Sequence, residues 1–112
     1  MQPLEARFLP FRGLGRFMAT SKLSRLECRV KPLRENNTSL LALYDAFFTS
    51  SEIELFDLTA DVIEKATDLR ASLNFKTPDS LHLATAIVYG ATSFVTGDKD
   101  LSRCSEISVE IL

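Results

Sequence analysis

The chain lacks the features that mark membrane and secreted proteins. It has no apolar run near the roughly 20 residues that a membrane helix needs. Its first residues are charged, with Glu5, Arg7 and Arg12, where a signal peptide would be apolar. Its two cysteines, Cys28 and Cys104, form no metal-ligand spacing. These absences predict a cytoplasmic protein with reduced thiols and no membrane partner.

The sequence also has no internal repeat, no low-complexity tract and no long linker. Its 112 residues suit one domain, so we expect residues 1–112 to fold as a single unit. Hydrophobic residues make up 46% of the chain, which is enough for a core and excludes a disordered composition.

Histidine is nearly absent, because His82 is the only one. A lone histidine on a helix is more often structural than catalytic, and we assign it no catalytic role. The acidic residues are therefore the main candidates for chemistry.

Charge is unevenly distributed along the chain. Residues 1–34 contain eight Lys or Arg residues and two acids, whereas the remainder contains five bases and thirteen acids. A basic segment beside an acidic one could guide a phosphate backbone toward a metal site. An ordinary solvated helix face explains the same pattern equally well.

Hydrophobic spacing predicts four main helices. The first begins after a strand over Arg16–Thr20, with Ser21 as its cap and Pro32 as its end. The second places Leu40, Leu43, Tyr44 and Phe47 on one face. The third follows a strand at Ile53–Leu58, and its cap is Thr59. The fourth begins with Thr77 as cap and Pro78 at the first position, and it stops at Gly90.

Two further strands and a short helix complete the pattern. We expect the strands at Ser93–Thr96 and Ile107–Leu112, with a helical turn at Lys99–Arg103 between them. Strands that alternate with helices predict an α/β domain in which helices flank a mostly parallel sheet.

Several acids come close to strand ends in this arrangement. Glu27 lies in the helix after the first visible strand, Asp79 in the first turn of a later helix, and Asp98 directly after Ser93–Val95. Asp100 is two residues further on. Ligands of open α/β sheets bind at the carboxyl ends of the strands, so these acids predict a site for Mg²⁺ or Mn²⁺. The chemistry that fits is water activation and attack on a phosphodiester.

Each acid also has a purely structural explanation. Asp79 would stabilise the helix dipole in the first turn of its helix. Asp98 and Asp100 would cap the short helix after Gly97. Spacing alone does not separate these roles from metal binding.

Three ordered motifs resemble the PIN-domain family, and in particular the VapC-like toxins of type II toxin–antitoxin pairs. The motifs are Ala19-Thr20-Ser21-Lys22-Leu23-Ser24-Arg25-Leu26-Glu27, Lys76-Thr77-Pro78-Asp79-Ser80-Leu81-His82-Leu83-Ala84-Thr85-Ala86 and Phe94-Val95-Thr96-Gly97-Asp98-Lys99-Asp100-Leu101. The likeness runs from about Phe17 to the C-terminus. It implies a three-layer PIN-like fold and a metal-dependent ribonuclease. It also implies an RNA substrate, a cognate antitoxin and a homodimer.

The resemblance assigns roles to individual acids. Glu27, Asp79 and Asp98 match the second, third and fourth acids of the family, so they would be catalytic and would bind Mg²⁺ or Mn²⁺. Asp100 would be an accessory metal ligand. His82 would support the helix beside the site without binding metal.

One departure from the family pattern affects activity. The family begins with a strand that ends in Asp-Thr or Asp-Ser, and nothing before Glu27 matches it. The chain reads as an N-terminally truncated, incomplete PIN-like domain that lacks the first acid. Two functions therefore stay open: an active ribonuclease toxin, or an inactive fragment or degenerate gene product that only binds an antitoxin or a sibling subunit.

Overall fold

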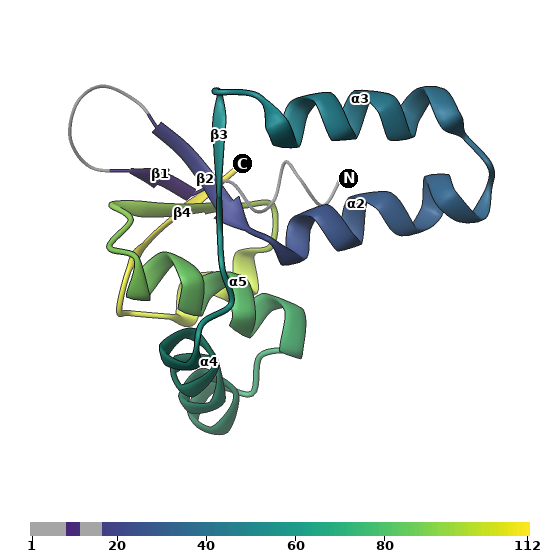
Figure 1. The fold of residues 1–112 in the computed structure, drawn as a ribbon. Coiled ribbons are helices and arrows are strands. Elements are labelled where there is room, and N and C mark those ends of the chain that lie inside the picture. Colours follow the sequence, from purple (N-terminus) through teal and green to yellow (C-terminus); the bar gives the residue numbers. More distant parts are fainter. Residues whose placement is uncertain (1–8, 12–16) are drawn as a thin grey trace.

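The computed structural model describes residues 9–11 and 17–112 (Figure 1). Two short strands come first, β1 (Leu9–Phe11) and β2 (Phe17–Ser21). Two helices, α2 (Leu23–Arg34) and α3 (Thr38–Thr49), lead to strand β3 (Ile53–Phe56). The helices α4 (Ala60–Leu73) and α5 (Thr77–Val88) follow. The chain closes with β4 (Ser93–Thr96), the 3₁₀ helix η1 (Lys99–Arg103) and β5 (Ser108–Ile111).

The strands pair mostly in parallel, as the alternating pattern predicts. Strand β2 runs parallel to β3, with Thr20 opposite Leu55, and β4 runs parallel to β5. Strand β1 is antiparallel to β2. Hydrogen bonding divides these strands into a sheet in the order β1-β2-β3 and a pair β4-β5. The α/β fold class with helices flanking a mostly parallel sheet is therefore confirmed.

The first long helix differs from its prediction at both ends. Ser21 is the last residue of β2 and not a cap, because the N-cap position belongs to Lys22, which makes no side-chain cap bond. Pro32 lies inside α2. A proline inside a helix lacks the N–H that would bond to the preceding turn, and its ring crowds the carbonyl four residues earlier. The helix nevertheless continues beyond Pro32, and Glu35 N–H donates to the Lys31 carbonyl at 3.0 Å.

The other helices begin and end close to their predicted positions. Thr59 is the N-cap of α4, and its hydroxyl accepts a hydrogen bond from Val62 N–H. In α5 the cap is Lys76, one residue earlier than expected, and Pro78 lies in the first turn. Gly90 has φ +76°, a left-handed conformation that suits glycine just beyond a helix end.

The main hydrophobic core lies between α4, α5 and the strands. Leu83, Leu69, Phe75 and Phe94 are almost completely buried there, together with Cys104. Figure 1 shows α4 and α5 lying together on one side of the strands. The hydrogen bond between His82 and Ser21 joins the middle of α5 to the end of β2.

A second, smaller cluster holds the α2–α3 hairpin against β3. Cys28, Tyr44 and Phe48 are its buried members. The hairpin extends away from the body of the molecule (Figure 1). Leu43 was expected on the buried face of α3, but it is 68% exposed. The one-face pattern is therefore wrong at this position, because the hairpin contacts the body on one side only.

The helices of the described ranges are short and mixed in character. Within residues 9–11 and 17–112, no helix has the length and apolar character needed to cross a membrane.

Candidate active site

A hydrogen-bonded chain joins the buried residues Ser21 and His82 to the partly exposed Glu27. The imidazole of His82 is completely buried. Its Nδ1 lies 3.0 Å from Ser21 Oγ, and its Nε2 lies 2.7 Å from Glu27 Oε1. These three residues come from β2, α5 and α2, so their meeting fixes the place where the three elements converge.

A second hydrogen bond ties the end of β2 to the first turn of α2. Thr20 Oγ1 and Ser24 Oγ are 2.6 Å apart, and both residues are fully buried. Buried hydroxyl groups need hydrogen-bond partners, and these two hydroxyl groups bond to each other. The helix that carries Glu27 is therefore fixed to the strand end that carries Ser21.

Asp79 lies in the first turn of α5 and is only 9% exposed. It precedes His82 by three residues, a spacing that places two helical residues on the same face. Asp79 therefore lies on the side of α5 that carries His82, one turn before the residue that bonds to Glu27. The position also places the Asp79 carboxylate at the positive end of the helix dipole, so Asp79 can stabilise α5 without binding a metal ion.

Asp98 follows β4 in an exposed position, and its local hydrogen bonds are structural. Its N–H donates to Thr96 Oγ1 at 3.1 Å, and its Oδ1 accepts from Asp100 N–H at 2.9 Å. Asp98 is thus the N-cap of η1, the capping role foreseen from its sequence.

Asp100 forms an ion pair with Arg103 on the surface of η1. Arg103 Nε and Nη2 donate to the two carboxylate oxygens at 2.7 and 3.0 Å. The hydrogen bond from Arg103 lowers the pKa of Asp100 below its ordinary value. Asp100 would therefore have to give up a bidentate partner before it could bind a metal ion.

The predicted acids do not all meet. In the part of the chain that the structure describes, no three His, Cys, Asp or Glu side chains form a group that could hold a metal ion. Mg²⁺ usually takes one or two protein carboxylates and completes its octahedron with water and substrate phosphate oxygens. Glu27 and Asp79 would suit such a hydrated ion, whereas the described residues do not form a closed protein cage.

Sequence reasoning missed the polar residues that hold this site together. Ser21 was expected to cap a helix, and His82 was given only a supporting role. The available signal was the three-residue spacing of Asp79 and His82, which places the histidine beside a candidate acid. The bonds from His82 to Ser21 and Glu27 span 61 and 55 residues, so spacing along the chain could not reveal them.

The basic residues of α2 are partly neutralised. Arg25 Nη1 and Arg29 Nε each lie 3.0 Å from Asp45 Oδ1 on α3, and Lys22 pairs with Asp57. Because these ion pairs neutralise part of the positive charge, they argue against the hypothesis that the basic residues guide a phosphate backbone toward a metal site. They agree better with the alternative, a solvated helix face that also joins α2 to α3.

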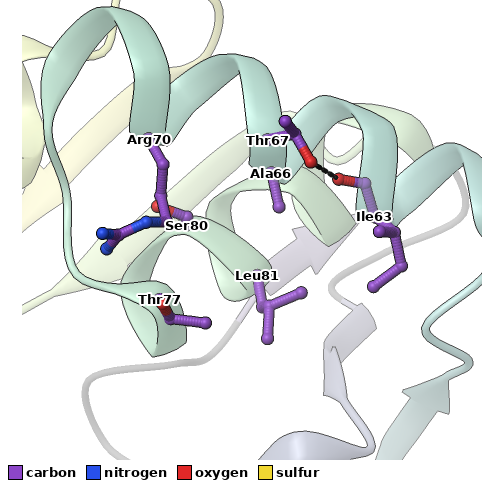
Figure 2. Close-up of a pocket in the computed structure, with 7 residues that line it drawn as sticks. All are labelled: Ile63, Ala66, Thr67, Arg70, Thr77, Ser80 and Leu81. Carbon is purple, nitrogen blue, oxygen red and sulfur yellow. Dashed lines mark hydrogen bonds between the residues drawn. The ribbon is translucent and has the colours of Figure 1, made fainter.

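A pocket of about 200 Å³ lies between α4 and α5 (Figure 2). Apolar and hydroxyl side chains line most of it, and Arg70 lies at its edge. The Arg70 guanidinium donates to the Phe75 carbonyl at 2.6 Å. None of the four predicted site acids lines this pocket, so we place the candidate chemistry at the convergence of β2, α2 and α5.

Comparison with known proteins identifies a family match. A family model described as PIN domain matches residues 6–107. The matched range begins ahead of Phe17, where the sequence resemblance was expected to start. No curated protein and no solved structure matches the chain.

Proposed function

The chain belongs to the PIN domain family, and from this premise we propose that it is a metal-dependent endoribonuclease of the VapC-like type, the toxin of a type II toxin–antitoxin pair. Membership of the family supports the coarser statement, a nuclease of the PIN superfamily. The observation that supports the proposal is the hydrogen bond from the partly exposed Glu27 to His82 of α5, the helix whose first turn holds Asp79.

We assign the metal-binding and catalytic roles to Glu27, Asp79 and Asp98, with Asp100 as an accessory ligand. Mg²⁺ or Mn²⁺, when bound, supplies a Lewis acid that stabilises charge on a phosphodiester. Glu27 is held in one orientation by its bond to His82, and Asp79 is screened from bulk water by burial. Asp98 would act from its exposed position at the end of β4, where an RNA backbone can reach it.

The direct test is RNA cleavage by the full chain in Mg²⁺, with Asp79→Asn as the main variant. The substitution removes the charge and keeps the shape, and we expect cleavage to fall at least tenfold. The matched control is Asp61→Asn, because Asp61 occupies the first turn of α4 as Asp79 occupies that of α5. If Asp79 only stabilises the helix dipole, the two variants will cleave RNA equally well.

Asp98→Asn separates capping from chemistry at the third acid. Asparagine is as good an N-cap as aspartate, so the bond from Asp100 N–H is retained while the charge is lost. We expect weaker cleavage with an unchanged melting temperature. Cleavage equal to that of the wild-type chain would remove Asp98 from the mechanism.

The toxin role and its partners are further parts of the proposal. We expect induced expression of the wild-type chain, but not of Asp79→Asn, to arrest growth of a bacterial host, because the substrate would be cytoplasmic RNA. We also expect a homodimer by light scattering, and capture of a cognate antitoxin. A folded chain that neither cleaves RNA nor arrests growth, yet still binds such a partner, would favour the alternative of an inactive binding protein.

A further inference from the structure

The protonation pattern of the Ser21–His82–Glu27 chain follows from its chemistry. With Glu27 ionised, its carboxylate only accepts hydrogen bonds, so Nε2 of His82 then carries the proton and donates to Glu27 Oε1 across 2.7 Å. The hydroxyl of Ser21 faces Nδ1 at 3.0 Å. Both ring nitrogens are therefore engaged, and the imidazole cannot rotate without breaking two hydrogen bonds.

The ring is held by rigid elements on both sides. Ser21 belongs to β2 and lies opposite Phe56 of the parallel strand β3. His82 lies in the middle of α5, where the residues from His82 to Ala86 are all buried. Glu27, in contrast, is carried by the α2–α3 hairpin, which packs less extensively against the body of the molecule.

A serine, a histidine and an acid in one chain also resemble the catalytic triad of a hydrolase. A nucleophilic serine must be reached by its substrate. Ser21 is fully buried at the end of a paired strand, and so is the ring that would activate it. The geometry therefore excludes a nucleophile and leaves an orienting role.

We infer that His82 is a positioning residue that fixes the Glu27 carboxylate for the divalent ion, with Ser21 as the anchor of the ring; this inference rests on the function proposed above. Partners that orient a metal ligand from behind contribute strongly to metal affinity, and their loss typically costs 10–100-fold. The hydrogen bond from Nε2 also limits the rotamers of a glutamate that is otherwise partly exposed.

Two histidine variants distinguish orientation from packing. In His82→Gln the amide nitrogen can occupy the position of Nε2 and still donate to Glu27, whereas in His82→Asn it can reach only the position of Nδ1. We would measure Mn²⁺ affinity of the metal-free full chain by calorimetry, together with melting temperature. We expect His82→Asn to lose about tenfold or more in affinity and His82→Gln to stay within about threefold of the wild type.

The controls make each outcome decisive. Glu27→Gln should weaken Mn²⁺ binding at least as much as His82→Asn. The inference alone would be overturned if neither histidine variant changed the Mn²⁺ affinity of the wild-type chain. It would also be overturned if both variants lost the same Mn²⁺ affinity together with the same decrease in melting temperature. A wild-type chain that binds no Mn²⁺ would overturn the proposed function and this inference with it.

A second measurement covers the case in which both histidine variants fail to fold. His82 is the only histidine, so the imidazole signals in a ¹⁵N–¹H spectrum of the wild-type chain belong to it. We expect a signal for a protonated Nε2 that shifts when Mg²⁺ is added and does not shift in Glu27→Gln. An unprotonated Nε2, or no change with Mg²⁺, would overturn the inference.

Discussion

Helix α5 buries Leu83 completely, whereas the α2–α3 hairpin leaves Leu26 and Leu43 59% and 68% exposed. Helix α3 is as rich in apolar residues as α5, so composition does not explain the exposure of Leu43. Helix α5 lies between α4 and the strands, while the hairpin meets the body mainly through β3 and one small cluster. An apolar residue is stabilising only where a neighbouring element removes it from water.

The candidate site joins these two regions. His82 and Asp79 come from the tightly packed helix, and Glu27 comes from the hairpin. The bond between His82 and Glu27 is therefore a connection between a rigid support and a less supported element. A change that loosens the hairpin should disturb Glu27 before it disturbs Asp79.

The largest expected effect compares a buried with an exposed leucine. Leu83→Ala removes a fully buried side chain, and we expect a loss of about 2–5 kcal/mol in the free energy of unfolding. Leu43→Ala should change it by no more than about 0.5 kcal/mol. Denaturant unfolding measures both. A comparable cost at Leu43 would mean that another molecule covers this face of α3 in solution.

The helix caps test whether the hairpin unfolds together with the body. Asn37 caps α3 by accepting from Leu40 N–H at 3.1 Å, and Thr59 caps α4 by accepting from Val62 N–H at 3.3 Å. Each alanine substitution should cost about 0.5–2 kcal/mol, whereas Asn37→Asp and Thr59→Ser should be nearly neutral. Thermal unfolding would report both losses if the chain unfolds in one step.

Different effects of the two cap substitutions on the melting temperature would contradict unfolding in one step. If Thr59→Ala lowers the melting temperature and Asn37→Ala does not, the hairpin opens as a separate unit. Hydrogen exchange of the α3 amides would then show faster opening than that of the α5 amides.

The smallest expected effect lies at the surface, beside the packed region. The hydrogen bond from Arg103 lowers the pKa of Asp100. Because the folded-state pKa is below the unfolded one, the pair stabilises the protein above the unfolded-state pKa, and this contribution is lost as pH falls through the folded-state pKa. Arg103→Met should raise the pKa of Asp100 toward its ordinary value in a carboxyl ¹³C titration. An unchanged pKa would show that Arg103 does not hold the carboxylate in solution.

Local sequence signals predicted most of the helices and strands. Thr59 with its apolar repeat predicted α4, and the pair of Pro78 and Gly90 marked the two ends of α5. These signals succeed because caps, turns and periodicity act between residues that are close in the chain. They failed at Pro32, because α2 tolerates the proline and continues to Arg34.

The site was harder to predict than the fold. The sequence identified Glu27 and Asp79 as candidates, and the resemblance to PIN domains supplied their proposed roles. It did not identify the support for Glu27, because Ser21 is an ordinary strand residue and His82 an isolated histidine until α5 packs against β2.

The sequence by itself determined the α/β class, the Thr59 cap of α4 and the family, since each depends on residue types at short or fixed spacing. Only the tertiary structure decided that Ser21, His82 and Glu27 form one hydrogen-bonded chain and that Leu43 stays exposed. Hydrogen bonds across 55 and 61 residues, and the covering of a helix face, depend on where separate elements meet in space.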